Sequence, residues 1–151
     1  MATWAEFAAA APSMAARGSE LIYRTPTGEA LLATVRRDGL PQIHPIYVGV
    51  TDGRLLAFIG SSPKAVDLAE DGRYALHTHQ DPAAPHEFLV RGHAVAVEDA
   101  ATRATFASDW YFEPDETYRL FEFFVEHAVL GERATADDWP PTYTTWRSPV
   151  G

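Results

Sequence analysis

The chain has 151 residues with 46% hydrophobic composition, no cysteine and a formal net charge of −9, which predicts a single domain over residues 1–151 with one hydrophobic core. The missing cysteines exclude disulfides, Cys-based zinc sites and thiol catalysis, and the acidic balance without a basic stripe argues against nucleic acid and anionic membranes as partners. The N-terminus shows no signal-peptide pattern and no apolar run approaches membrane-spanning length, so a cytoplasmic location is expected.

Two helical pieces are expected at the N-terminus. Thr3 and Glu6 are spaced as a capping box ahead of the first piece. Pro12 interrupts it, and a second piece is expected over residues 13–23.

A meander of three strands is expected next, over residues 29–37, 40–51 and 54–60. Two Asp-Gly dipeptides separate these runs, and Asp-Gly tolerates the positive φ angles of tight hairpin turns. In the first strand we expect one face to point into the core and the other away from it. The core face would carry Leu31, Ala33 and Val35, and the opposite face Thr34 and Arg36.

The stretch "SSPKAVDLAEDG" predicts a short helix, with Ser62 as N-cap, Pro63 in the first helical position and Gly72 as the stop. Beyond it we expect strands at 73–79 and 86–98, helices at 99–112 and 115–130, and a last short strand in "TYTTWRS". In the strand at 86–98, alternation predicts that Phe88, Val90, Ala94 and Ala96 point inward. Antiparallel hairpins with one short crossing helix favour a small closed barrel, mainly β with flanking helices.

Lys64 is the only lysine of the chain and lies in the first turn of the short helix. A helix N-terminus carries unpaired N–H groups and about half a positive charge, so a lysine there is unfavourable without an anionic partner. The hydroxyls of Ser61 and Ser62 add donors, and a phosphate would satisfy the whole corner. The alternative is an ordinary N-cap beside a solvated lysine.

Other polar groups admit two interpretations each. Arg36 with Thr34 could line a groove or be a surface charge beside a turn. Four side chains on neighbouring strands could bind Zn²⁺ or Fe²⁺, namely His77, His79, Glu87 and His93, but Arg73 would repel a metal, so no metal site is predicted. The sequence contains no nucleophile elbow and no dinucleotide or Walker motif.

Three segments together carry a resemblance: "LLATVRRDGLPQIHPIYV", "GRLLAFIGSSPKAVDLAEDGRYAL" and "EFLVRGHAVAVED". They resemble the pyridoxamine-phosphate-oxidase-like flavin-binding split barrels, over residues 30–99. The resemblance implies a six-stranded antiparallel Greek-key split β-barrel with N-terminal helices, a short crossing helix and two helices before the last strand. It also implies a homodimer that holds FMN, or a deazaflavin coenzyme, at the subunit interface.

The resemblance further implies which residues contact the cofactor. Thr34, Val35 and Arg36 would lie on the strand that runs along the flavin, and His44, Phe58 and Ile59 would lie near its ring. Ser61, Ser62 and Lys64 would form the phosphate-binding corner. Glu87 would contact the cofactor from across the barrel, and Trp146 and Arg147 from the C-terminal strand. Vitamin B6 oxidases have an Arg-Lys pair where this chain has Pro63-Lys64, and a neutral amide is common at the position of Glu87. These departures favour a flavin or deazaflavin reductase of the wider superfamily over a pyridoxamine-phosphate oxidase.

The leading hypothesis is therefore an oxidoreductase in which a bound flavin exchanges hydride at N5 with a small organic substrate. His44 is the best candidate for an acid or base, because imidazole titrates near neutral pH. A non-catalytic flavin or haem carrier with histidine ligands is the alternative. A deazaflavin-dependent reductase is a second alternative, and a dimeric barrel without any cofactor a third.

Overall fold

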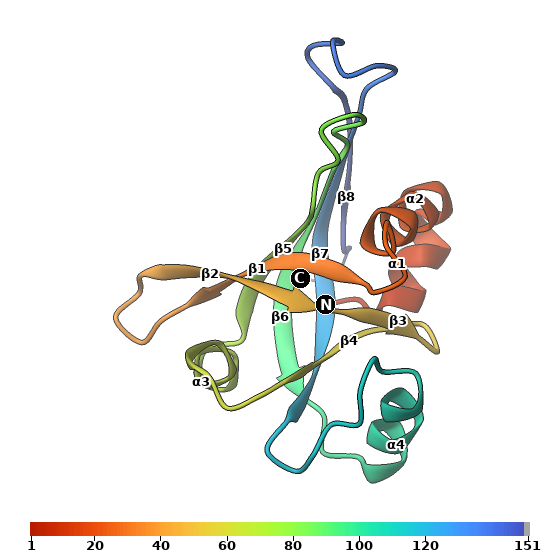
Figure 1. The fold of residues 1–151 in the computed structure, drawn as a ribbon. Coiled ribbons are helices and arrows are strands. Elements are labelled where there is room, and N and C mark those ends of the chain that lie inside the picture. The colour runs from red at the N-terminus through yellow and green to blue at the C-terminus, as the bar shows by residue number, and fades with distance from the viewer. Residues whose placement is uncertain (150–151) are drawn as a thin grey trace.

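The computed structural model describes residues 1–149, and these form four helices and eight strands (Figure 1). The helices are α1 (Trp4–Ala10), α2 (Pro12–Ile22), α3 (Pro63–Glu70) and α4 (Ala100–Ser108). The strands are β1 (Glu29–Val35), β2 (Pro41–Tyr47), β3 (Gly49–Thr51), β4 (Arg54–Ile59), β5 (Arg73–Thr78), β6 (Glu87–Ala96), β7 (Arg119–Glu132) and β8 (Thr142–Arg147). None of the helices in this part of the chain is long and apolar enough to cross a membrane.

The strands form one curled antiparallel sheet in the order β2-β1-β5-β6-β7-β4-β3, and β8 pairs with β7. Figure 1 shows β7 and β8 extending beyond the body, where the β5–β6 and β7–β8 loops form the tip of a projecting arm. Helices α1 and α2 lie against one side of the sheet, and α4 lies at the end remote from the arm. The expected mainly β split barrel with flanking helices is confirmed.

The N-terminal helices cover the barrel core. Thr3 and Glu6 form the expected capping box, in which the Thr3 hydroxyl accepts from the Glu6 N–H and the Glu6 carboxylate accepts from the Thr3 N–H. This cap starts α1 so that Trp4 and Phe7 turn inward, and Phe7 is fully buried. The Trp4 ring meets Phe88 of β6 edge to face at 6.2 Å between centroids. The predicted inward face of β6 is confirmed by the burial of Phe88, Val90 and Ala94, while Ala96 is partly buried.

The predicted facing of the first strand is wrong by one residue. Ala30, Leu32 and Thr34 are the buried residues of β1, whereas Leu31 is 38% exposed. The run "EALLATV" is apolar on both faces, so alternation does not decide which face is inside. Thr34 can occupy the inner face because its hydroxyl donates to the carboxylate of Asp67, 2.8 Å away.

The predicted helix at 115–130 is wrong, because residues 119–130 belong to the 14-residue strand β7. The spacing of Phe121 and Val125 fits one helical turn, but the segment is apolar almost throughout and has no clear period. Pairing decides the structure, since β7 lies between β6 on one side and β4 and β8 on the other. One helix, α4, therefore precedes the last strand instead of two.

The described residues form eight strands instead of the six expected, for two reasons. One is β7, and the other is the division of the predicted strand at 40–51 into β2 and β3. The division falls at Val48, which is fully buried and whose N–H donates to the carbonyl of Gly28. The chain thus leaves the pairing with β1 at this point and continues as β3 beside β4.

Candidate functional site

A cavity of about 660 Å³ opens where β4 ends and α3 begins. Its volume lies in the range of roughly 300–1,000 Å³ that is typical of small-molecule sites. Aromatic side chains supply much of the wall, namely Tyr47, Phe58, Trp110, Phe112 and Tyr118. The polar groups stand toward two ends, with Ser61, Ser62 and Lys64 at one and Glu29 and His79 at the other. Such a cavity suits a flat, partly charged ligand.

The corner between β4 and α3 holds the only lysine of the chain. Ser62 is the N-cap residue of α3, as the sequence predicts, but its hydroxyl donates to the carbonyl of Gly60 at 2.9 Å and makes no capping bond to the helix. Pro63 supplies no N–H, and the Lys64 side chain makes no hydrogen bond or ion pair to any residue of the range 1–149. An unpaired ammonium group therefore stands at a helix N-terminus beside the exposed Ser61.

His44 lies beside this corner on β2, although it is not part of the cavity wall. Burial and the positive charge of Lys64 lower the pKa of His44 below its ordinary value, and Asp67 partly offsets the shift. The ring is therefore neutral at pH 7. Its Nε2 is buried without a hydrogen-bond partner among the described residues, so this nitrogen has an unused hydrogen-bonding capacity. The predicted acid–base role of His44 stays a prediction.

The residues predicted on the first strand lie away from the cavity within one chain. Thr34 is buried and donates to Asp67, which also accepts from Gln42 Nε2 at 3.0 Å. Arg36 lies 3.4 Å from Asp38 and lines a different groove, on the other side of α3. Val35 lines neither the cavity nor that groove. Their contacts with a cofactor stay predictions.

The remaining predicted residues lie on the strands of the arm, also outside the cavity wall. Glu87 accepts a hydrogen bond of 2.6 Å from the Tyr143 hydroxyl, which raises the pKa of Tyr143. Trp146 packs on Phe7 with 5.0 Å between ring centroids, and Arg147 stands opposite His127 in the β7–β8 pairing. Their contacts with a cofactor stay predictions.

Several cavity residues are missed by the sequence analysis. Trp110, Phe112 and Tyr118 come from the segment after α4, where the aromatic cluster reads as core packing. The hydroxyl of Tyr111 ties this segment to the barrel, accepting from the Gly28 N–H and donating to the Val48 carbonyl. The run "WYF" next to an acidic, proline-containing loop is the one local signal that could have indicated a wall.

The strand histidines do not form a metal centre. Within residues 1–149 no group of three or more histidine and carboxylate side chains is arranged to hold a metal ion. His93 is instead paired with Glu126 at 2.8 Å, and His77 Nδ1 lies 2.7 Å from the Thr78 carbonyl.

Comparison with known proteins identifies the fold. The sequence matches no family model and no curated protein. Among solved structures, a haem-binding protein from Mycobacterium smegmatis is 18% identical with a TM-score of 0.63, over 85% of this chain and 57% of that protein. This chain thus spans little more than half the length of that protein.

Two further structures are similar over most of both chains. A Clostridium acetobutylicum protein related to general stress protein 26, of the pyridoxinephosphate oxidase family, is 15% identical with a TM-score of 0.63, covering 87% of this chain and 92% of that one. The haem storage protein of Vibrio cholerae is 16% identical with a TM-score of 0.59, covering 77% and 89%. The chain therefore has the fold of the pyridoxamine 5'-phosphate oxidase-like split barrels, which its sequence resembles.

Proposed function

We propose that this protein is a flavin-dependent oxidoreductase that holds FMN in the cavity at the β4–α3 corner. The observation that carries the proposal is the unpaired Lys64, which stands at a helix N-terminus and opens on a cavity with aromatic walls. A phosphate dianion would satisfy the ammonium group and the backbone N–H of Lys64. The other N–H groups of this turn are not available, because Pro63 has none and those of Ala65 and Val66 donate to the Ser62 carbonyl. In a chain of net charge −9, such a focused positive site is where an anionic cofactor would be attracted.

Different residues would bind different parts of the cofactor. Lys64 and the Ser61 hydroxyl would hold the phosphate, and the aromatic walls would enclose the ring and exclude water from it. FMN supplies hydride exchange at its N5 when bound. The neutral His44, with its unbonded Nε2, would hold or accept a proton beside the corner.

The protein is proposed to act as a homodimer. The outer face of the β1–β2 pair is apolar and exposed, with Ile43 at 71% and Leu31 at 38%. Burying such side chains against a second copy would be favourable. Sedimentation velocity at micromolar concentration is expected to give the mass of a dimer, and a monomer throughout would contradict this part of the proposal.

Lys64→Ala tests the cofactor proposal. The variant is expected to bind FMN about tenfold to a hundredfold more weakly, because a hydrogen bond to a charged group is lost. Riboflavin, which has no phosphate, is expected to bind parent and variant equally. Arg37→Ala is the matched control, since Arg37 is already paired with Glu70 and lies outside the cavity wall. Unchanged FMN affinity in Lys64→Ala, by fluorescence titration, would overturn the assignment.

A haem carrier is the second candidate. It is favoured by His79 in the cavity wall and by the two haem-binding proteins that share the fold. Histidine is a common axial ligand of haem iron. Tight haem binding that His79→Ala abolishes, together with no FMN binding, would select this candidate. A titration with the deazaflavin coenzyme, followed by the coenzyme's own fluorescence, tests whether the protein binds it in place of FMN.

A further inference from the structure

The end of the cavity remote from Lys64 combines two titratable groups from adjacent strands. Glu29 is the first residue of β1, and it pairs with Tyr47 of β2. Because Ala30 pairs with Thr78 of β5, His79 follows in register beside Glu29. Glu29, Tyr47 and His79 all line the cavity. A carboxylate and an imidazole thus stand side by side at this end.

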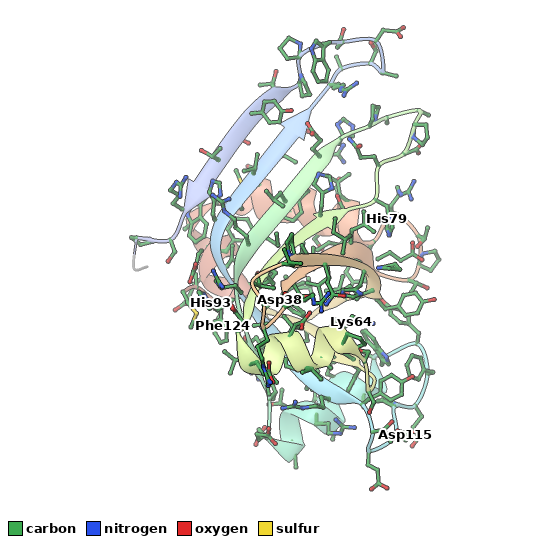
Figure 2. The ribbon with its side chains drawn as sticks, turned by 90° about the vertical axis from the view of Figure 1, so that its left-hand side faces the viewer. Asp38, Lys64, His79, His93, Asp115 and Phe124 are labelled. Atoms are coloured by element: carbon green, nitrogen blue, oxygen red, sulfur yellow. The ribbon has the colours of Figure 1, made fainter. Side chains whose placement is uncertain are left out.

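This end lies further along β2 than the Lys64 corner. His44 is close enough to Lys64 for the ammonium charge to lower its pKa, and Tyr47 is three residues further along the same strand. Three residues of extended strand span about 10 Å. Figure 2 shows Lys64 and His79 on the same side of the molecule, with His79 nearer the arm. The cavity therefore has a cationic group at one end and a carboxylate at the other.

Trp110 adds a donor to the cavity wall. It is only 8% exposed, and its Nε1–H has no acceptor within the described part of the chain. Its ring is held by its neighbours, with centroids 5.6 Å from Phe58, 5.1 Å from Phe106 and 4.8 Å from Tyr111. A buried indole N–H normally finds a hydrogen-bond partner, and leaving it without one costs free energy. The missing acceptor is expected on the ligand.

We infer that Glu29, His79 and Trp110 recognise a lactam or imide edge of a planar ring. Such an edge offers a carbonyl to the Trp110 N–H and a ring N–H to the Glu29 carboxylate, and His79 can donate or accept. The inference rests on the proposed function and deepens it, because the pyrimidine edge of a flavin presents N3–H between two carbonyls. Haem offers no N–H donor to this carboxylate. The three residues are therefore assigned as specificity-determining residues.

The test uses lumiflavin and 3-methyllumiflavin, which lack the phosphate and so do not depend on Lys64. The protein is expected to bind lumiflavin about tenfold more tightly than the methylated ring, which has no N3–H to donate. Glu29→Ala is expected to remove this discrimination. Trp110→Phe keeps an aromatic ring and is expected to weaken both compounds about fivefold to tenfold. Trp139→Phe is the matched control, because Trp139 is 74% exposed and outside the cavity wall. Quenching of the ring fluorescence reports each affinity.

Equal affinity of the parent protein for the two compounds would overturn the inference, and so would discrimination that survives in Glu29→Ala, which would point to steric exclusion of the methyl group. If FMN still binds and Lys64→Ala still weakens it, the proposed function stands while the inference fails. A parent protein that binds neither FMN nor lumiflavin overturns both. Should Trp110→Phe fail to fold, the comparison of the two compounds on the parent protein and on Glu29→Ala still decides.

Discussion

Basic side chains lie on two sides of helix α3, and the two sides differ in whether the positive charge is paired with a carboxylate. On the cavity side, Lys64 makes no ion pair or hydrogen bond to any described residue. On the other side, a groove of about 760 Å³ contains Arg36 beside Asp38 and Arg37 paired with Glu70. An anion in the groove would have to compete with these carboxylates. In this acidic chain, one basic side chain without a carboxylate partner is therefore a better candidate for binding an anion than two arginines that already have such partners.

The two sides share one anchor, Asp67. Its carboxylate is 7% exposed and accepts from the Thr34 hydroxyl and from Gln42 Nε2. These bonds join α3 to β1 and β2, so they fix where the helix N-terminus and Lys64 stand. Three changes test this difference between the two sides of α3: removal of the Asp67 carboxylate, protonation of His44, and removal of the Glu70 partner of Arg37.

The largest effect is expected from Asp67→Ala. The substitution leaves the buried Thr34 hydroxyl and the partly buried Gln42 amide without an acceptor, which should lower the free energy of unfolding by about 3 kcal/mol. Urea denaturation measures the change. Asp67→Asn retains one carbonyl oxygen as acceptor and should recover about half of the loss. A loss below about 1 kcal/mol in Asp67→Ala would show that these bonds do not anchor the helix.

A smaller effect is expected from the protonation of His44. Its pKa is lowered in the folded protein from an ordinary value of 6.5, so the unfolded chain binds the proton more readily than the folded one. The contribution to stability is therefore complete above about pH 6.5 and is lost as the pH falls below it.

Unfolding experiments at pH 7.5 and pH 5.5 can isolate this effect, since His44→Gln should lose less stability on acidification than the parent protein. His127 has a pKa lowered by burial and by Arg147 and Arg91, so His127→Gln gives a comparison at a second site. An identical pH dependence in His44→Gln and the parent would refute the role of His44.

The smallest effect is expected from Glu70→Ala, which breaks the ion pair with Arg37 in the groove. Arg37 is 84% exposed, so water screens the pair and the urea midpoint should not change measurably. The variant also leaves Arg37 without its carboxylate. If the double variant Lys64→Ala/Glu70→Ala bound FMN more tightly than Lys64→Ala, the ion pairing of the basic residues would be the only relevant difference between the two sides of α3. No recovery is expected, because the groove lacks the aromatic walls of the cavity.

The corner between β4 and α3 could be predicted from the sequence because its signals are local. A strand that ends in glycine, two serines, a proline at the first helical position and a lysine in the first turn all lie within residues 58–64. The structure places Phe58, Ile59, Ser61, Ser62 and Lys64 together in one cavity wall. Ser62 is the N-cap residue as predicted, although its hydroxyl bonds to Gly60 and not to the helix.

Features that depend on contacts between distant parts of the chain could not be predicted from the sequence. The facing of β1 could not be decided because both faces of the strand are apolar, and the buried hydroxyl of Thr34 finds its acceptor 33 residues away. The strand β7 has helical spacing by chance, and its pairing with three other strands overrides that pattern. The cavity wall joins Glu29, His79 and Trp110 from three separate segments, and no short-range pattern links them.

By itself the sequence determined the β-rich class of the fold, the N-terminal capping box and the corner of α3, because turn residues, caps and the position of a lone lysine act within a few residues. Only the tertiary structure decided which face of β1 is buried, which arginines are neutralised and which aromatic side chains wall the cavity. Those properties depend on groups that are distant in the chain, and strand pairing brings them within bonding distance only when the whole sheet has formed.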